Sequence, residues 1–477
     1  MERSPASKLA VVAVSADGES RDWHMGELIA RSAGLSGAIA ARGVERGDAV
    51  MTLVGSRIEW VLAMLACFRM GAVALPCNPQ LRRHDLEVRA SAAAPKLCIG
   101  EERLLGELPE GVPAMTVDEV ADALDEDRPQ ETPADIADLD PGDPAVIIFT
   151  SGTTGEPRGV VYPQRYLTGQ RLQAEHWVGA EKGDLAWCTA APGWSKSTRN
   201  VFIAPWLQGA AALIHDARFD PAERLDLIER EGVTVLCQAP TEYRMLAKRT
   251  ELRRIASLRR LVSAGEPLNP EVIRQFRSEM KLAIGDGYGQ TETGPVAGMR
   301  PDEDDPERDG SMGRPLPGIE VRVNKGQLEV RPGTVPTFFS HYLGEEPFEG
   351  EWWPTGDQVR EDEDGYLWFE GREDDIILSA GYRIGPFEVE SALVSHPRVA
   401  EAAAVAAPDE ERGSVVRAIV VLRDGEPSER LAEELQEHVR EETAPYKYPR
   451  IVEFAEELPK TASGKVKRNE LREKTAH

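Results

Sequence analysis

The stretch from residue 145 to residue 159 reads Ala145-Val-Ile-Ile-Phe149 followed by Thr150-Ser-Gly-Thr-Thr-Gly-Glu-Pro-Arg-Gly159. The first five residues form a short apolar run, the pattern of a fully buried β-strand. The loop after it contains three glycines, which allow positive φ and let backbone N–H groups turn toward an anion. Four hydroxyl side chains and Arg158 add hydrogen-bond donors and a fixed positive charge. The stretch therefore predicts a buried strand that ends in a phosphate-binding loop.

This loop is not of the Walker A type, because it lacks the Gly-Lys-Ser/Thr ending that such a loop requires. A P-loop kinase or ATPase therefore loses its main support. Taken alone, the loop would also fit a hydroxyl-rich turn that binds nothing.

Strand-like and helical runs alternate on both sides of this loop. Residues 220–231 have helical spacing, Gly232 ends them, and 233–237 form a β-branched run. The unit repeats with a strand over 258–263 and a helix that begins after Asn269 as N-cap and ends at Met280. This alternation predicts an α/β fold of layered sheets and helices with mostly parallel strands.

Beyond Arg372 the pieces become shorter, with a helix over 388–394, strands over 400–407 and 415–422, and a helix capped by Ser428. We therefore expect a large N-terminal domain over residues 1–371, a hinge over 372–375, and a small α+β domain over 376–477 with its own core.

Composition excludes several classes of protein. The 477 residues are 41% hydrophobic and 29% charged, as in a globular protein. Because 82 acidic residues face 56 basic ones, the net charge of −26 argues against nucleic-acid binding. The longest apolar stretch, Trp60 to Phe68, is too short for a membrane span, and no signal sequence is recognisable, so a cytoplasmic protein is expected. The five cysteines form no CxxC pair, which predicts buried thiols without disulfides or zinc.

The charge is unevenly distributed along the chain. Residues 101–140 contain fourteen acidic residues and two arginines, a net charge of −12, and are expected to form a solvated connecting region. From Pro445 to His477 eight basic residues face five glutamates, a net charge of +3. This basic end suggests a local anionic ligand, although a solvated charged tail is the alternative.

Further motifs follow the loop in order. They are Ser263-Ala-Gly-Glu-Pro267, Asp286-Gly-Tyr-Gly-Gln-Thr-Glu-Thr-Gly294, Trp353-Pro-Thr-Gly-Asp357, Gly371-Arg-Glu-Asp-Asp375, Ser379-Ala-Gly-Tyr-Arg-Ile-Gly385 and Pro459-Lys-Thr-Ala-Ser-Gly-Lys465. In this order and spacing they resemble the adenylate-forming superfamily of acyl-CoA synthetases, nonribosomal-peptide adenylation domains and luciferases. Three segments, 194–197, 381–390 and 445–450, are most similar to the medium-chain acyl-CoA synthetases.

The resemblance implies an AMP-forming carboxylic acid:CoA ligase that uses ATP, Mg²⁺ and coenzyme A. Medium-chain, branched and aryl carboxylates all fit as the acid, and the enzyme is expected to be a monomer or homodimer. One alternative is an adenylating enzyme that delivers its acyl group to the phosphopantetheine of a carrier protein. A catalytically inactive relative is the other, although Glu292, Asp357, Arg372 and Lys465 are all present.

By the same resemblance, the catalytic residues are Lys465, Thr291, Glu292 and Arg383, and Glu292 helps to hold Mg²⁺. ATP would be bound by Thr150, Ser151, Gly152, Thr153, Thr154, Gly155, Glu156, Pro157, Arg158, Gly265, Glu266, Pro267, Asp286, Gly287, Tyr288, Gly289, Gln290, Thr291, Asp357, Arg372 and Lys465. Where the family commonly has Lys, this chain has Arg158, which keeps the charge but presents a planar fork. We therefore expect retained activity with altered affinity for ATP or pyrophosphate.

Two further sites are implied by the resemblance. Coenzyme A would contact Gln80, Ala380, Gly381, Tyr382, Arg412, Arg440, Tyr448, Pro449 and Arg450. The acyl pocket would include Gly193, Trp194, Gln208, Tyr288 and Gly289, although Trp194 would equally fit a core position. The small domain would rotate about a hinge at Asp374 between the two half-reactions.

Overall fold

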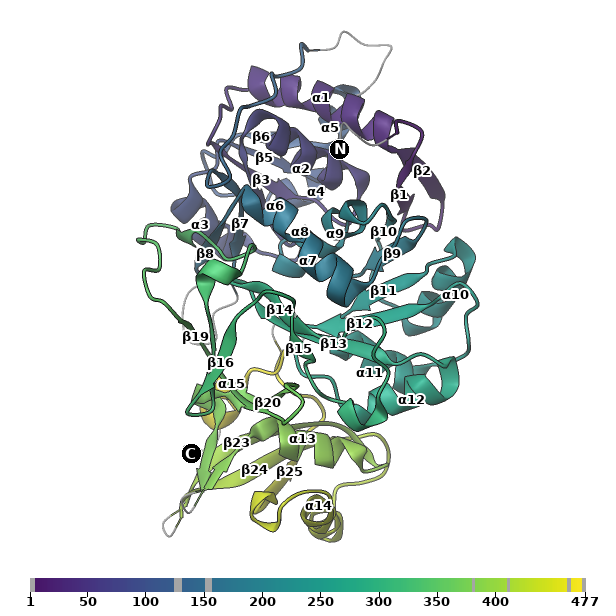
Figure 1. Ribbon diagram of the computed structural model, residues 1–477, viewed down its shortest axis with the longest axis vertical. Helices are drawn as coiled ribbons and strands as arrows, with labels where there is room; N and C mark the ends of the chain where they lie inside the picture. Colours follow the sequence, from purple (N-terminus) through teal and green to yellow (C-terminus); the bar gives the residue numbers. More distant parts are fainter. Residues whose placement is uncertain are drawn as a thin grey trace.

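The computed structural model describes residues 5–123, 131–150, 157–379, 382–409, 412–460 and 465–473. In Figure 1 a large part that contains the N-terminus lies above a small part that contains β23, β24, β25, α13 and α14. The expected α/β fold, with a large N-terminal and a small C-terminal part, is confirmed.

The first sheet of the large part has the strand order β18-β8-β7-β4-β3-β5-β6. The strands are β3 (Ala49–Leu53), β4 (Val73–Pro76), β5 (Leu97–Gly100), β6 (Ala114–Thr116), β7 (Pro144–Phe149), β8 (Gly159–Pro163) and β18 (His341–Tyr342). The strands from β3 to β7 pair in parallel, and β8 joins β7 in antiparallel. The apolar run at 145–149 is therefore the buried strand that its composition predicts.

The helices that precede or follow these strands in the chain are α1 (Met25–Ala41), α2 (Ile58–Met70), α3 (Arg83–Ala93), α4 (Glu102–Leu105), α5 (Val117–Ala123) and α6 (Arg165–Gly169). After them come α7 (Arg171–Gln173) and the π-helical turn η1 (Ala174–Val178), whose Trp177 packs on glycines of the second sheet. The α2 helix is buried on nearly every side, which fits its apolar sequence.

The second sheet has the strand order β15-β14-β13-β12-β11-β9-β10-β1-β2. The strands are β1 (Leu9–Val14), β2 (Ser20–His24), β9 (Leu185–Cys188), β10 (Ala211–His215), β11 (Val235–Gln238), β12 (Arg260–Ala264), β13 (Ile284–Gln290), β14 (Gly294–Gly298) and β15 (Arg314–Pro315). The helices α8 (Ser195–Asn200), α9 (Ile203–Leu207), α10 (Pro221–Glu231), α11 (Pro240–Arg249) and α12 (Pro270–Met280) alternate with its strands. A large apolar core that includes Trp60, Tyr162 and Phe202 joins the two sheets.

The third sheet is antiparallel and links the two parts of the molecule. Its strands are β16 (Val321–Asn324), β17 (Gln327–Val330), β19 (Trp353–Glu361) and β20 (Leu367–Arg372), in the order β16-β17-β19-β20. Short 3-10 helices lie at Pro306–Arg308 (η2), Pro332–Thr334 (η3) and Glu373–Asp375 (η4). The predicted hinge residue, Asp374, is in η4, directly after the last strand of this sheet.

The small part begins with the hairpin β21 (Ile377–Ser379) and β22 (Tyr382–Ile384). It continues with α13 (Pro386–Ser395), β23 (Val399–Asp409), β24 (Gly413–Leu422), α14 (Glu429–Glu442), η5 (Pro445–Lys447), β25 (Ile451–Phe454) and α15 (Arg468–Glu473). Leu431, Leu435 and Val439 of α14 enter an apolar core drawn from residues after 376. The small part therefore has an apolar core of its own.

Asn269 is the N-cap residue of α12, as expected, but its side chain makes no capping bond, since its Oδ1 atom accepts from Arg244 Nη1 (3.4 Å) while its Nδ2 atom donates to Ser391 Oγ of the small part (3.2 Å). One local expectation was wrong. The acidic segment 101–140 is not merely a connector, since Met115, Val117 and Val120 are buried and extend the first sheet with β6 and α5.

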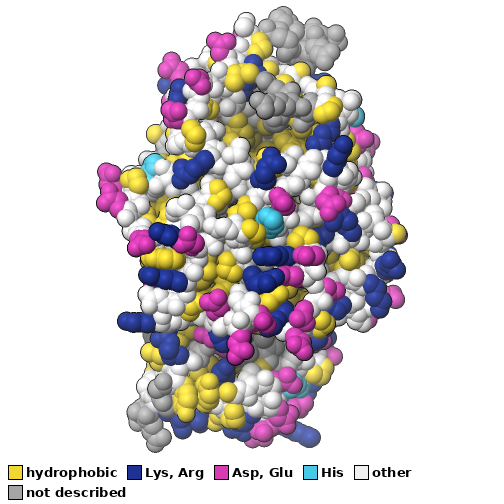
Figure 2. Space-filling model, viewed as in Figure 1, with side chains coloured by type: hydrophobic (Ala, Val, Ile, Leu, Met, Phe, Trp, Pro, Cys, Tyr) yellow, Lys and Arg dark blue, Asp and Glu magenta, His cyan; other side chains and the backbone are white. Residues whose placement is uncertain are grey.

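The cysteines, the helices and the surface charges can be compared with what the composition predicts. All five cysteines are buried and unpaired. Among the described helices, none combines the length and the hydropathy that a membrane span requires. On the face in Figure 2, acidic and basic side chains are interspersed over both parts of the molecule.

Candidate active site

The phosphate-loop motif connects two paired strands. Because β7 and β8 are antiparallel neighbours, the motif leaves the first sheet at Phe149 and returns to it at Gly159. Thr150 N donates to Arg158 O (2.9 Å), which closes the base of the loop. Six of the predicted residues, Ser151, Gly152, Thr153, Thr154, Gly155 and Glu156, lie outside the described residues. Pro157 is half-buried and Arg158 is exposed.

Arg158 is held by groups far away in the sequence. Its guanidinium forms a bidentate ion pair with Glu345 (2.6 and 2.7 Å) and lies 3.4 Å from the ring centroid of Tyr342. The Tyr342 hydroxyl in turn donates to Glu292 Oε1 (2.7 Å). The predicted phosphate ligand and the predicted metal ligand therefore both contact one tyrosine.

A second cluster surrounds Asp357. Since β19 and β20 place Asp357 opposite Arg372, the Arg372 Nη1 atom reaches Asp357 Oδ1 (3.0 Å). Gln290 Nε2 and the Tyr288 hydroxyl, both from β13, donate to the other carboxylate oxygen. Trp353 Nε1 donates to Gln290 Oε1 (3.1 Å) and orients it. The structure thus brings together four of the residues predicted for ATP.

The Asp357 cluster is poorly hydrated. Burial raises the pKa of Asp357, while Arg372 and the hydrogen bond from Tyr288 oppose that rise. Burial and the charge of Asp357 raise the pKa of Tyr288 well above its usual value, so the phenol stays a donor. The cluster therefore presents an oriented carboxylate, which suits a ligand with paired hydroxyl groups.

Glu266 and Asp286 belong to successive motifs, and their pKa values are shifted in opposite directions. Burial acts to raise the pKa of Glu266, but Arg244 and the bonds from Thr241 outweigh it, so the pKa lies below its usual value. Burial raises the pKa of Asp286 to about 8. Glu266 is therefore an anion at neutral pH, whereas Asp286 is largely protonated.

The neighbouring motif residues are close-packed. Gly265 has φ +109°, and a Cβ atom there would lie 3.8 Å from Lys196 Nζ. Lys196, from α8, donates to the carbonyl of Ala264 (2.6 Å). Behind β13, Gly287 packs on Trp177, where no Cβ atom would fit. Pro267 accepts a long hydrogen bond from Arg244 (3.5 Å).

Lys465 reaches these clusters from the small part. It keeps a solvent-exposed surface, yet protein atoms crowd its ammonium. This desolvation lowers the pKa of Lys465, Lys196 and Arg372 act in the same direction, and Glu266 and Asp357 oppose it. The predicted catalytic lysine is therefore within electrostatic range of both predicted ATP-binding carboxylates. Thr291, also assigned to catalysis, accepts a bond at its carbonyl from the Tyr162 hydroxyl (2.6 Å).

The predicted acyl-pocket residues adjoin α8 and β13. Gly193 has φ +89°, and a Cβ atom there would lie 2.5 Å from the backbone nitrogen of Asn78, so only glycine fits this approach. A Cβ atom on Gly289 would lie 2.1 Å from Gly294 O. Trp194 is the half-buried N-cap residue of α8. Gln208 follows α9, and its Nε2 atom is buried without a partner.

The residues predicted for coenzyme A are dispersed. Arg440 and Arg450 lie over the Tyr448 ring, at 3.9 and 5.0 Å from its centroid, and Tyr382 stacks on Tyr446 with centroids 4.2 Å apart. Pro449 is buried, Arg412 donates its backbone N–H to Asp409, and Gln80 is an exposed residue of the large part. Ala380 and Gly381 lie outside the described residues.

Arg383 has a role in the structure that its motif does not reveal. Its Nη2 atom donates to Gln358 Oε1 on β19 (3.0 Å), so it ties the small part to the third sheet. In this arrangement the Arg383 guanidinium is bonded to Gln358, the residue that follows Asp357 in the sequence.

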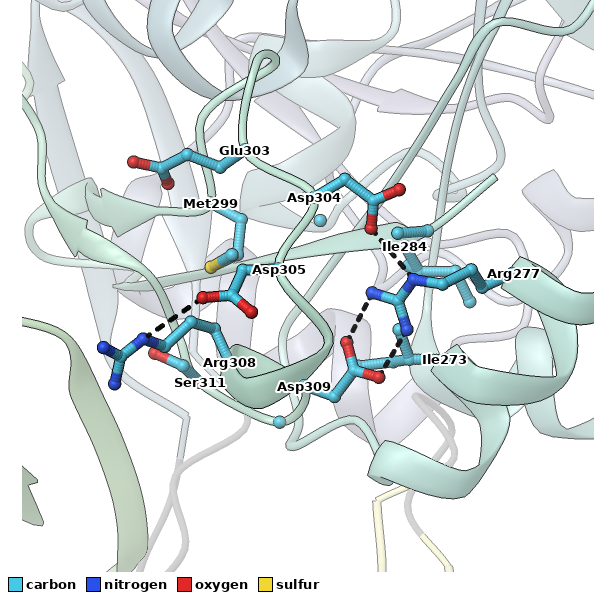
Figure 3. A pocket seen from close by; sticks show the side chains of 13 residues that line it. Ile273, Arg277, Ile284, Met299, Glu303, Asp304, Asp305, Arg308, Asp309 and Ser311 are labelled. Carbon is cyan, nitrogen blue, oxygen red and sulfur yellow. Dashed lines mark hydrogen bonds and ion pairs between the residues drawn. The ribbon is translucent and has the colours of Figure 1, made fainter. Parts of the chain in front are cut away.

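A pocket elsewhere is lined by acids and arginines. Figure 3 shows Arg277 bonded to Asp309 and Asp304, with Arg308 facing Asp305. These charges neutralise one another, and the described residues contain no group of three potential metal ligands. The pocket is therefore explained as a structural ion-pair cluster.

Comparison with known proteins identifies the family. The profile of the AMP-binding enzymes matches residues 1–337, and that of the AMP-binding enzyme C-terminal domain matches residues 388–465. The chain belongs to the AMP-binding enzyme family. Its predicted membership of the adenylate-forming enzymes is thereby confirmed.

The alignments with individual relatives cover almost the whole chain. An uncharacterized acyl-CoA ligase of Bacillus subtilis is 38% identical, over 99% of this chain and 95% of its own. A mitochondrial acyl-coenzyme A synthetase of Mus musculus is 39% identical, over 97% of this chain and 86% of its own. The crystal structure of an anthranilate CoA ligase in complex with anthranoyl-AMP superposes with a TM-score of 0.88 at 28% identity, over 98% and 94% of the two chains.

These relatives bear out the main functional prediction. The chain is an AMP-forming acid–thiol ligase of the acyl-CoA synthetase type, with ATP and coenzyme A as substrates. The carrier-protein alternative is not favoured, because the relatives are CoA ligases.

Sequence reasoning missed three residues of the site. Tyr342 and Glu345 lie in no motif, and they reach Arg158 because β18 pairs with β8. Lys196 was visible within the segment Trp194-Ser-Lys-Ser, which also marks the subfamily, but nothing in the segment shows that the ammonium reaches Ala264.

Proposed function

We propose that this AMP-binding enzyme activates its acid and transfers it to free coenzyme A at a single site, with Lys465 serving the first step. A carboxylate oxygen attacks the α-phosphorus of ATP, the bond to the β-phosphate bridging oxygen breaks, and pyrophosphate leaves. The thiol of coenzyme A then attacks the acyl carbon, AMP departs with the former carboxylate oxygen, and the thiol proton passes to solvent.

The observation that carries this proposal is the cluster of Arg372, Tyr288 and Gln290 around Asp357, with Lys465 within electrostatic range of Asp357 and Glu266. In the first step negative charge grows on the phosphate oxygens, so a fixed ammonium stabilises the transition state more than the ground state. Asp357, oriented by Arg372 and Tyr288, would accept from the ribose hydroxyls. Arg158 and the loop from Thr150 would bind the outer phosphates.

Mg²⁺ fits the donor set around Glu292. The Tyr342 hydroxyl occupies Oε1 of Glu292, which leaves Oε2 as a hard oxygen ligand. Mg²⁺ usually takes one or two protein carboxylates and completes its shell with phosphate oxygens and water. When bound, it would offset charge on the phosphates, while Tyr342 holds the carboxylate in position.

For the second step, we propose that residues 376–477 rotate about the hinge at 372–375. Lys465 would then leave the reaction centre, and the hairpin that contains Tyr382 would take its place. Coenzyme A is an anion with three phosphate groups, so Arg440, Arg450 and Arg412 suit it electrostatically. Arg383 would exchange its bond to Gln358 for a phosphate or substrate group.

The test separates the two half-reactions. Lys465→Ala should abolish acyl-adenylate formation, measured as ATP–pyrophosphate exchange. The rate of thioester formation from supplied acyl-AMP should stay within about twofold of wild type, because the lysine acts only in the first transition state. Lys467→Ala is the matched control, since Lys467 pairs only with Glu470 on the surface among the described contacts. Equal loss of both half-reactions in Lys465→Ala would contradict the proposed division.

A panel of carboxylic acids defines the substrate. AMP release that requires both an acid and coenzyme A would support the proposed reaction. Exchange without thioester formation would contradict the assignment of free coenzyme A as the acceptor.

A further inference from the structure

Arg199 is unusual among the buried arginines of the described chain. Arg199, Arg224, Arg260 and Arg417 are all at most 7% exposed. Arg224 bonds to Gln238 and Glu242, Arg417 pairs with Glu453, and Arg260 donates to two backbone carbonyls.

Arg199 has no comparable partner. Its Nε and Nη1 atoms are buried without a hydrogen-bond acceptor, and no carboxylate in the described residues forms an ion pair with it. The groups around it are the phenols of Tyr162 and Tyr166 and the thiol of Cys237, on whose ionisation its charge acts. Arg199 is therefore a buried cation without a counter-charge.

Such an arrangement is costly in a folded protein. Burying a guanidinium removes its water, and the loss is normally repaid by a carboxylate or by several carbonyl groups. Arginine cannot escape the penalty by deprotonating, because its pKa stays far above neutral. A bound anion is the simplest group that would compensate it.

The position of Arg199 indicates which anion this is. It lies on α8, which begins directly after Trp194, one of the residues proposed for the acyl pocket. The charge of Arg199 acts on the ionisation of Tyr162, whose hydroxyl donates to Thr291 O (2.6 Å). Arg199 is therefore separated from the predicted reacting position at Thr291 by one buried phenol.

The surroundings of Arg199 are polar as well as buried. Gln173 Nε2 donates to Asn200 Oδ1 (2.7 Å), while the Gln173 Oε1 atom is buried without a partner, and the Tyr166 phenol is a polar neighbour of the Arg199 guanidinium. A site for an unsubstituted alkyl chain would gain nothing from these groups, since buried polar atoms without partners only cost free energy.

We propose that Arg199 binds a second carboxylate of the acid, so that the enzyme activates dicarboxylates. One carboxylate reacts with ATP beside Thr291 and Lys465, and the other forms an ion pair with Arg199. This inference rests on the proposed function and narrows its substrate to acids with an anionic far end.

The experiment compares each dicarboxylate with its own monomethyl ester, which keeps the length and removes one charge. The series runs from malonate to suberate and includes the phthalates, and CoA-dependent AMP release gives kcat/KM. For the best dicarboxylate, kcat/KM should exceed that of its monoester by about 10- to 100-fold, the usual contribution of a hydrogen bond to a charged group. In Arg199→Met this ratio should fall to about one, and Arg199→Lys should retain part of it.

Arg165→Met is the matched control. Arg165 is a half-buried arginine next to Tyr166 in the sequence, and it donates to the carbonyl of Phe338 (3.1 Å), so the ratio should be unchanged. If Arg199→Met fails to fold, two measurements on the wild-type protein still test the inference. The kcat/KM ratio of dicarboxylate to monoester should be well above one, and the dicarboxylate should protect the protein against thermal unfolding more than the monoester does.

Three results would overturn the inference. A wild-type enzyme that prefers the monoesters or simple fatty acids has no site for a second carboxylate. An equal loss with every acid in Arg199→Met would assign the arginine to the reacting carboxylate or to the fold. If no acid supports CoA-dependent AMP release, the proposed function fails and this inference fails with it, whereas activity confined to monocarboxylates leaves the proposed function intact.

Discussion

The ion pair between Arg158 and Glu345 predicts that this enzyme binds ATP less tightly than it could. Arg158 must leave Glu345 before its guanidinium can reach a phosphate, and Glu345→Gln removes that competitor. Both side chains are about half exposed, at 49% and 51%. Ion pairs of this exposure contribute about 0.2–1 kcal/mol. The substitution should therefore lower the KM for ATP by up to about fivefold.

The assay is ATP–pyrophosphate exchange at two salt concentrations. Because salt screens exposed charges, the gain should shrink as ionic strength rises. Glu346→Gln is the matched control, since Glu346 is an exposed neighbour for which the structure describes no ion pair. The free energy of unfolding should change by less than about 1 kcal/mol in both variants. An unchanged or increased KM in Glu345→Gln would refute the idea that Glu345 competes with phosphate.

The remaining predictions concern the Asp357 cluster, a buried acid and the small part. Tyr288→Phe removes a donor from Asp357, so the KM for ATP should rise by about two- to tenfold in the same exchange assay. Asp286 has a raised pKa of about 8, so its stabilising effect is complete at acid pH and is lost as the pH rises toward 8. The stability of wild type relative to Asp286→Asn, measured by urea unfolding, should therefore fall between about pH 4 and pH 8 and then level off. Ser428→Ala removes the cap of α14 and should cost about 1 kcal/mol of unfolding free energy, measured by urea unfolding.

The parts of the fold that the sequence predicted rest on local signals. The α10 helix has Asp220 as a capping side chain, Pro221 at its first position and Gly232 at φ +70° as its end. Each of these depends on neighbours within four residues, so a single sequence contains the whole signal. The apolar run of β7 and the Ser428 cap of α14 were predictable for the same reason.

The parts that it did not predict depend on distant contacts. Arg158 and Glu345 are 187 positions apart, and no spacing rule relates them. Asn269 has the chemistry of an N-cap, but its Oδ1 atom accepts from Arg244, 25 positions away. The unpaired state of Arg199 is visible only when every residue around it is known.

The contacts between the two parts bear on the proposed rotation. Arg383 to Gln358 and Asn269 to Ser391 are polar bonds that water can replace at a net cost of about 1 kcal/mol each. A groove of about 340 Å³ also lies between the parts and is lined by Pro270, among other residues. Their interface is therefore not packed like a protein interior.

The core of the small part is independent of this interface. Its buried members run from Ile377 to Val439 and lie wholly after the proposed hinge. Phe369 and Phe387 are an aromatic pair that crosses between the parts, with ring centroids 6.4 Å apart. Rotation about residues 372–375 would thus break a few polar bonds and one aromatic contact while leaving the cores on both sides intact. We infer that the small part moves as a rigid body, and that the arrangement with Lys465 within electrostatic range of Asp357 serves adenylation.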